Sequence, residues 1–135
     1  MLAGVAALRM GAGRLSMAVA ESVAPHVAVA VPESGVHGLP ENASGSITGE
    51  DAGRLLEREV RRGDALLVGP GLDDADGTVT VLEELLPLVP EDLPVVLDAY
   101  GATVLPDLDP ALVERISGRL ALTPNTGELG IIIGS

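Results

Sequence analysis

The chain of 135 residues is long enough for one domain with a hydrophobic core and too short for two ordinary domains. Its 20 acidic residues against 8 basic ones give a formal net charge of -12, and Tyr100 is its only aromatic residue. This composition argues against a nucleic-acid partner, because phosphate neutralisation needs a basic face and base stacking needs aromatic rings.

The predicted elements alternate between helices and strands. In chain order they are a helix over 2–10, a strand over 14–20, a helix over 21–29, a strand over 36–39, a helix over 50–62, a strand over 65–68, a helix over 77–88, a strand over 95–98, a short helix after Pro110, a strand over 120–123 and a helix beginning near Gly127. This alternation predicts an α/β fold with a mostly parallel sheet covered on both faces. Right-handed crossovers then place every strand-to-helix loop at one edge of the sheet.

Both ends of the sequence fall inside predicted helices. No Ser, Thr, Asp or Asn caps the first helix, and the apolar run 129–133 has just begun the last one when the sequence stops at Ser135. A sheet interrupted there would expose an edge and an apolar face. We therefore expect residues 1–135 to form a single partial domain, incomplete at both ends, with that face covered by further chain or by a partner.

The Ala- and Val-rich start of the chain does not resemble a membrane helix or a secretory signal. Arg9, Arg14 and Glu21 interrupt it before the roughly 18 consecutive apolar residues that a membrane helix needs. It also lacks the basic start and small-residue cleavage site of a signal peptide. We expect a cytoplasmic protein without a membrane partner.

The loop Gly69-Pro70-Gly71 follows an apolar strand directly. Glycine lets a ligand approach the backbone closely, and proline stiffens the turn, so the loop is a candidate ligand contact through Gly69 and Gly71. A tight strand-to-helix turn without a ligand explains the same residues. The loop is neither a Walker loop nor the G-x-G-x-x-G fingerprint of dinucleotide-binding folds.

Acidic residues after this loop allow two interpretations. Asp73, Asp74 and Asp76 suit either helix capping or a magnesium cluster, and capping is the commoner role at a helix start. The chain has no Cys, so disulfides, thiolate metal sites and Cys nucleophiles are excluded. Its two histidines, His26 and His37, are too few and too scattered for a metal cluster.

Two further strand ends carry polar residues. Asp98 ends an apolar strand, where its carboxylate either orients a ligand hydroxyl or caps the next turn. Residues 123–128 (Thr-Pro-Asn-Thr-Gly-Glu) place Thr123, Asn125 and Glu128 between a strand and a helix, where free backbone N–H groups favour anions or ribose hydroxyls. The same segment also predicts a capping box, with Thr126 or Asn125 as the cap and Glu128 close behind.

Several motifs taken together resemble the ADP/ATP-dependent NAD(P)H-hydrate dehydratase family. They are residues 6–13 (Ala-Ala-Leu-Arg-Met-Gly-Ala-Gly), 20–22 (Ala-Glu-Ser), 68–72 (Val-Gly-Pro-Gly-Leu), 96–99 (Val-Leu-Asp-Ala) and 122–128 (Leu-Thr-Pro-Asn-Thr-Gly-Glu). The resemblance spans nearly the whole chain. It implies a ribokinase-like three-layer α/β/α fold.

The resemblance also implies an activity, a nicotinamide nucleotide repair. The S epimer of hydrated NADH or NADPH (NADHX or NADPHX) loses water through a phosphorylated intermediate, at the expense of ADP or ATP with Mg2+. By similarity, Gly71 and Asn125 contact the hydrated dinucleotide, with Gly69, Asp98, Thr123 and Glu128 as neighbouring substrate-binding candidates. The partners that the resemblance implies are further copies of the chain, in a homo-oligomer (a tetramer), and a fused or separate NAD(P)H-hydrate epimerase.

The sequence departs from the family pattern in three places. Asn125-Thr126 stand where most members have His-Pro, so a role that needs a titrating imidazole is lost. Asp98-Ala99-Tyr100 stand where the family has Asp-Ala-Asp, which leaves only Asp98 to carry over. The family's Gly-Thr/Ser-Gly-Asp loop, which holds the expected general base, lies beyond Ser135, so no catalytic residue is assigned.

Two alternative functions remain compatible with these residues. One is a small-molecule kinase of the ribokinase superfamily that acts on a vitamin or sugar hydroxyl. The other is a noncatalytic fragment or assembly module whose remaining sheet is supplied by another chain. Activity on hydrated NADH with ADP or ATP would separate the dehydratase from the kinase, and mass spectrometry of the protein would test the fragment.

Overall fold

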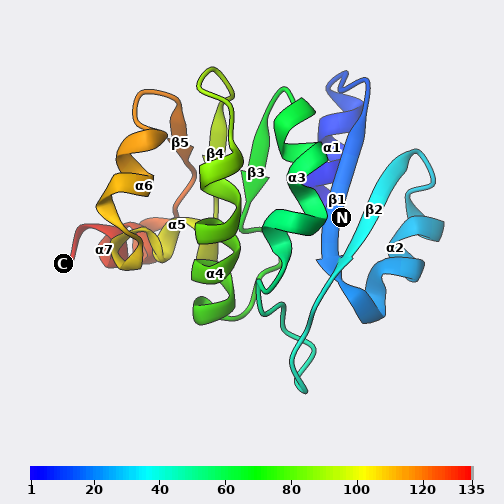
Figure 1. Ribbon diagram of the computed structural model, residues 1–135, viewed down its shortest axis with the longest axis horizontal. Coiled ribbons are helices and arrows are strands. Elements are labelled where there is room, and N and C mark those ends of the chain that lie inside the picture. Colours follow the sequence, from blue (N-terminus) through cyan, green and yellow to red (C-terminus); the bar gives the residue numbers. More distant parts are fainter. Residues whose placement is uncertain (135) are drawn as a thin grey trace.

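A computed structural model describes residues 1–134 of the chain (Figure 1). The helices are α1 (Leu2–Arg9), α2 (Ala24–Ala30), α3 (Ala52–Arg62), α4 (Ala75–Leu85), α5 (Tyr100–Thr103), α6 (Pro110–Arg115) and α7 (Thr126–Ile133). The strands are β1 (Leu15–Ala20), β2 (Ser34–Leu39), β3 (Leu66–Val68), β4 (Val95–Leu97) and β5 (Leu120–Leu122). Short 3-10 turns are η1 (Glu21–Val23), η2 (Leu86–Leu88) and η3 (Leu105–Asp107). The predicted alternation of helix and strand is confirmed.

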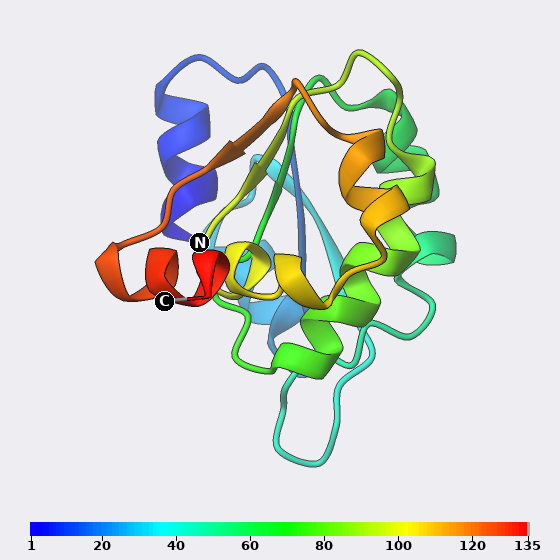
Figure 2. The same ribbon diagram turned by 90° about the vertical axis from the view of Figure 1, so that its left-hand side faces the viewer.

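All paired strands run parallel, but they form two sheets instead of the one that the sequence predicts. β1 pairs with β2 over six residues, and β4 lies between β3 and β5. The two sheets lie side by side in one layer (Figures 1 and 2). Every strand-to-helix loop of β3, β4 and β5 therefore opens at the same edge, as parallel strands require.

Helices lie on both sides of this strand layer. α3, α4 and α6 lie on one side, and α1 and α7 on the other (Figure 2). The core lies under α3, α4 and α6, where Leu82, Leu97 and Ile116 are fully buried. On the opposite face of β3, Leu67 is 45% exposed. No helix among residues 1–134 has both the length and the apolar character to cross a bilayer.

Helix α4 ends earlier than the apolar pattern predicts. The predicted helix runs to residue 88, but the α-helix stops at Leu85 and continues as the 3-10 turn η2, which contains Pro87. Proline has no N–H for the helical hydrogen bond, and its ring clashes with the preceding turn. Pro25 is tolerated as predicted, because it lies in the first turn of α2.

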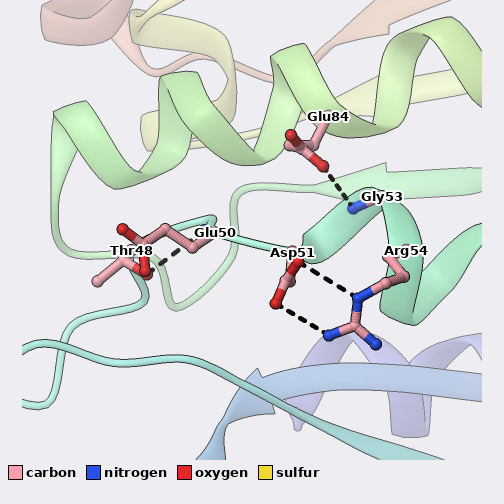
Figure 3. Close-up of polar contacts among 6 residues, drawn as sticks. All are labelled: Thr48, Glu50, Asp51, Gly53, Arg54 and Glu84. Atoms are coloured by element: carbon pink, nitrogen blue, oxygen red, sulfur yellow. Dashed lines mark hydrogen bonds and ion pairs between the residues drawn. The ribbon is translucent and has the colours of Figure 1, made fainter.

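The start of α3 is attached to α4 by a polar contact (Figure 3). The Gly53 N–H donates to Glu84 Oε2 at 3.1 Å, which satisfies one of the free N–H groups of the first turn. Asp51, in the left-handed conformation with φ of 60°, precedes the helix and accepts two hydrogen bonds from Arg54. The Arg54 guanidinium hydrogen bond, followed by its charge, holds the pKa of Asp51 below its ordinary value.

Candidate functional site

The predicted site residues lie at the carboxyl edge of the second sheet. Gly69 follows β3, Asp98 follows β4 and Thr123 follows β5. Because β3, β4 and β5 are parallel neighbours, these three positions stand side by side at one edge. α5 and α7 begin just beyond it (Figure 2). Gly71 and Asn125 are each two residues further along their loops.

The close packing of this edge requires a glycine at position 69. It is buried, with φ of 130°, and a Cβ at this position would overlap the carbonyl oxygen of Asp98. Gly101, at the second position of α5, is in similar contact with the carbonyl group of Val68. The loops after β3 and β4 are thus pressed together backbone against backbone. This contact explains Gly69 without any ligand, so its primary role is structural.

Gly71 differs from Gly69 in its surroundings. It is exposed, with φ of 92°, and no heavy atom outside its immediate chain neighbours lies within 4 Å of where its Cβ would stand. The glycine is therefore needed for its backbone conformation alone, since L-residues rarely adopt this φ. Its surface is open to a ligand, and it stays the candidate contact in this loop.

Asp98 and Thr123 form a direct side-chain hydrogen bond. The Thr123 hydroxyl donates to Asp98 Oδ1 at 2.7 Å, which joins the ends of β4 and β5. The structure does not show Asp98 capping the next turn, and its other predicted role, orienting a ligand hydroxyl, stays a prediction. The residue before α5 is Ala99, and no side chain caps that helix. The Asp98 carboxylate is therefore held by a neighbouring strand and not by its own turn.

Asn125 and Glu128 form the capping box that the sequence predicts. Asn125 Oδ1 accepts from the N–H groups of Gly127 at 2.9 Å and Glu128 at 3.0 Å. Glu128 Oε2 accepts from the Asn125 N–H at 2.8 Å. Both side chains thus satisfy free N–H groups at the start of α7. The side-chain NH2 group of Asn125 is what remains to donate to a ligand.

The acidic residues after Gly71 belong to the start of α4. Asp74 Oδ1 accepts from the Gly77 N–H at 2.7 Å, as an N-cap does. The capping interpretation is confirmed for Asp74. In residues 1–134 no three acidic or histidine side chains come together in a way that could hold a metal ion.

Two surface hollows lie away from this edge. One, of about 400 Å³, is lined by α1 and by residues 30–33, which lead into β2. The other, of about 280 Å³, is lined by residues 61–64 and by Pro90, Asp92 and Leu93, which lead into β3 and β4. Both border segments that precede strands, at the amino ends, whereas the predicted site lies at the carboxyl ends.

Sequence reasoning missed one residue that shapes the edge. Ala99 has φ of 47°, a conformation that strains an L-residue, and it turns the chain from β4 into α5. The four-residue helix α5 that follows was not predicted either. No sequence signal marks this turn, because Ala99 is not one of the residues that favour positive φ. The small residues at 99, 101 and 102 were the only hint of close packing.

The fold belongs to the ribokinase-like class. A crystal structure of a ribokinase-like superfamily protein from Enterococcus faecalis matches with a TM-score of 0.72 and 21% identity, over 94% of this chain and 40% of that one. A hypothetical protein from Streptococcus mutans matches with a TM-score of 0.80 and 18% identity, over 98% of this chain and 43% of that one. At these identities the likeness defines the fold.

The sequence identifies the family within this class. Residues 1–135 match the NAD(P)H-hydrate dehydratase family, and the chain belongs to it. It is 40% identical over 134 residues to an ADP-dependent (S)-NAD(P)H-hydrate dehydratase of Xanthomonas campestris pv. campestris. It is 36% identical to a bifunctional NAD(P)H-hydrate repair enzyme of Moorella thermoacetica and 33% identical to an ATP-dependent (S)-NAD(P)H-hydrate dehydratase of Rattus norvegicus.

The chain spans less than half of these relatives. It covers 43% of the Xanthomonas enzyme, 24% of the Moorella enzyme and 34% of the rat enzyme. In the opposite direction, the matches to the first two cover 99% of this chain and the match to the third 91%. The similarity therefore describes one continuous part of the relatives' length.

Proposed function

We propose that this chain supplies the substrate-binding part of a nicotinamide nucleotide repair enzyme. The reaction is the dehydration of (S)-NADHX or (S)-NADPHX to NADH or NADPH, driven by ADP or ATP. Family membership over residues 1–135 supports the reaction class. The observation that carries the site is the junction of Gly69, Asp98 and Thr123 at one edge of a parallel sheet.

Each candidate residue has a distinct part in this proposal. Gly71 leaves an open backbone surface beside the edge, where the ligand approaches. Asp98 accepts a hydrogen bond from a ligand hydroxyl, because an ionised carboxylate offers about four acceptor positions and Thr123 takes one. Asn125 donates through its side-chain NH2 group, since its oxygen is engaged at the start of α7.

We assign the phosphoryl transfer of this reaction to no residue within 1–134. In the reaction, the hydroxyl added by hydration takes the terminal phosphoryl group of ADP or ATP, which leaves AMP or ADP. Inorganic phosphate and a proton of the neighbouring ring carbon are then lost as the ring double bond forms. Phosphoryl transfer depends on positioned cations and N–H donors around the phosphate. The described residues hold no cluster that fits Mg2+. The dependence on ADP or ATP is named for the relatives, and it comes to this protein as a proposal.

The test is an assay on protein expressed from its full reading frame. Hydrated NADH is incubated with ADP or with ATP, and recovery of the reduced-nicotinamide absorbance band is followed. Recovery that requires one of the two nucleotides supports the dehydratase. Phosphorylation of a vitamin or sugar alcohol without this recovery supports the kinase. Neither activity, with the protein folded, supports a noncatalytic module and overturns the proposal.

Further parts of the proposal concern assembly and location. We propose a cytoplasmic homo-oligomer, a tetramer, that works with an epimerase acting on the R epimer. Bifunctional repair enzymes among the relatives support the epimerase link. Exposed apolar residues on α7, Ile131 at 60% and Ile133 at 65%, indicate a surface that either further chain or a partner subunit covers. Mass measurement in solution tests the oligomer.

A further inference from the structure

The main chain of Asp98 is fixed on several sides. Its N–H donates to the Val68 carbonyl oxygen at 3.1 Å, which continues the pairing of β4 with β3. Its carbonyl group lies against Gly69, where no side chain fits. The next residue, Ala99, has a φ of 47° that turns the chain away from the strand. Only the side-chain torsions of Asp98 remain to be set.

Thr123 uses both of its polar hydrogens inside the protein. Its N–H donates to the Leu97 carbonyl oxygen at 3.2 Å, which continues the pairing of β5 with β4. Its hydroxyl donates to Asp98 Oδ1 at 2.7 Å. A β-branched residue also has few side-chain rotamers, so the hydroxyl direction is well defined. Thr123 therefore has no hydrogen left to donate to a ligand hydroxyl or phosphate.

The second carboxylate oxygen of Asp98, unlike the first, has no hydrogen-bond partner among the described residues. Oδ2 makes no hydrogen bond within residues 1–134, and the side chain is half-buried, not surrounded by solvent. The helix that follows, α5, takes no side-chain cap from it. An acceptor oxygen is thus left at the carboxyl edge, where β4 ends between β3 and β5.

We propose that Thr123 is a positioning residue for Asp98, and not a contact of the substrate itself. Its hydroxyl fixes the Asp98 carboxylate so that Oδ2 accepts a hydrogen bond from a hydroxyl group of the hydrated nicotinamide nucleotide. This inference rests on the proposed function. The energetic reason is preorganisation: a carboxylate that is already oriented loses less side-chain freedom when the substrate binds.

The test compares three single variants of the protein expressed from its full reading frame. Thr123→Val keeps the shape and removes the hydroxyl, and KM for hydrated NADH should rise roughly tenfold while kcat falls less than about threefold. Thr123→Ser restores the hydroxyl and should return KM to within about twofold of wild type. Thr126→Val is the matched control, because Thr126 is the exposed first residue of α7 and its hydroxyl makes no hydrogen bond within residues 1–134. Its KM should not change.

A double-variant cycle separates positioning from direct contact. Asp98→Ala removes the carboxylate, so adding Thr123→Val to it should change KM by less than about twofold. A second loss of about tenfold in that background would mean that Thr123 contacts the substrate on its own, and the inference would be overturned. A KM for Thr123→Val equal to that of wild type would also overturn it.

A failure of the proposed function can be distinguished from a failure of this inference. If wild-type protein neither dehydrates nor binds hydrated NADH, the proposed function fails, and the positioning claim is decided by a crystal structure of Thr123→Val. The Asp98 carboxylate should leave its present orientation there, while the capping box at Asn125 stays intact. An unchanged carboxylate would show that Thr123 does not position it. Circular dichroism of each variant confirms folding.

Discussion

The two sheets of this protein are stabilised in different ways. The β1–β2 pair is the longer, with parallel pairing over six residues, but in residues 1–38 only Val27 and Val31 are buried apolar side chains. The β3–β5 sheet has strands of three residues, yet sixteen of the seventeen buried residues of the core cluster follow β2, and the first sheet contributes only Leu39, at the end of β2. The sheet with the longer strand pairing is thus not the sheet around which most apolar side chains are buried.

This difference shows which region positions the candidate site. Burial is the dominant stabilising term in folding, so the rigid part of the molecule is the one that holds Gly69, Asp98 and Thr123. In the β1–β2 region, large apolar side chains such as Leu2 and Met10 are 87% and 88% exposed. In the 135-residue chain taken by itself, we expect local opening to occur first in residues 1–38 and last around β4.

Truncating one buried residue in each region tests this comparison, and of all the variants it should change stability the most. Leu82 is 0% exposed in the core cluster, and Leu82→Ala should lower the free energy of unfolding by about 4 kcal/mol. Val27 is 7% exposed on α2, and Val27→Ala should cost about 1.5 kcal/mol. Urea unfolding followed by circular dichroism measures both. Equal losses would contradict the view that the two regions differ in packing.

Glycine substitutions give the next largest contrast. Gly69→Ala places a methyl group on the Asp98 carbonyl oxygen, so the loops must separate, at a cost of about 3 kcal/mol. Gly35 on β2 is the matched control. A Cβ there would meet Ser16 Oγ at 3.5 Å, an ordinary contact. Gly35→Ala should not destabilise the protein, and should stabilise it by roughly 0.5–1 kcal/mol because alanine loses less backbone freedom in a strand. A neutral Gly69→Ala would show that the edge is looser than described.

Sequence patterns predicted most of the fold, because helix and strand periodicities depend on local burial. The five strands and the long helices lie where the apolar spacing predicts them, and Pro25 and Asp74 have the roles expected of a first-turn proline and a cap. The division into two sheets and the helix α5 were not predicted. Both depend on contacts between segments distant in sequence, such as Gly101 against Val68.

The sequence predicted where the residues of the candidate site lie, but not which of them contact one another. Parallel strands bring their carboxyl ends to one edge, so the meeting of residues 69, 98 and 123 follows from the topology. The hydrogen bond between Thr123 and Asp98 does not follow from it, because side-chain torsions depend on the turn at Ala99. The binding roles of Gly71 and Asn125 stay predictions.

Because the backbone at Ala99 is strained, an alanine-to-glycine substitution should have opposite effects on stability in the two regions. Glycine adopts the φ of 47° without a Cβ penalty, so Ala99→Gly should stabilise the protein by about 1 kcal/mol. Ala18, exposed in β1, has ordinary strand conformation, and Ala18→Gly should destabilise by roughly 0.5–1 kcal/mol. Thermal unfolding distinguishes the signs. A loss of stability in both variants would mean that Ala99 is not strained.

The smallest effect lies between the two regions, where Asp51 and Arg54 begin α3. The hydrogen bond and charge of Arg54 lower the pKa of Asp51 from 3.8 in the folded state. The stabilisation is therefore fully present above the unfolded pKa and is lost as pH falls through the lower folded pKa. Because both side chains are mostly exposed, the effect of the pair on unfolding should be too small to measure, and NMR titration of Asp51 is the sensitive readout. Arg54→Gln should return the pKa of Asp51 toward 3.8, whereas Arg61→Gln, which breaks the exposed pair with Glu57, should leave it unchanged. An Asp51 pKa that stays low in Arg54→Gln would assign the shift to the free N–H groups of α3 instead.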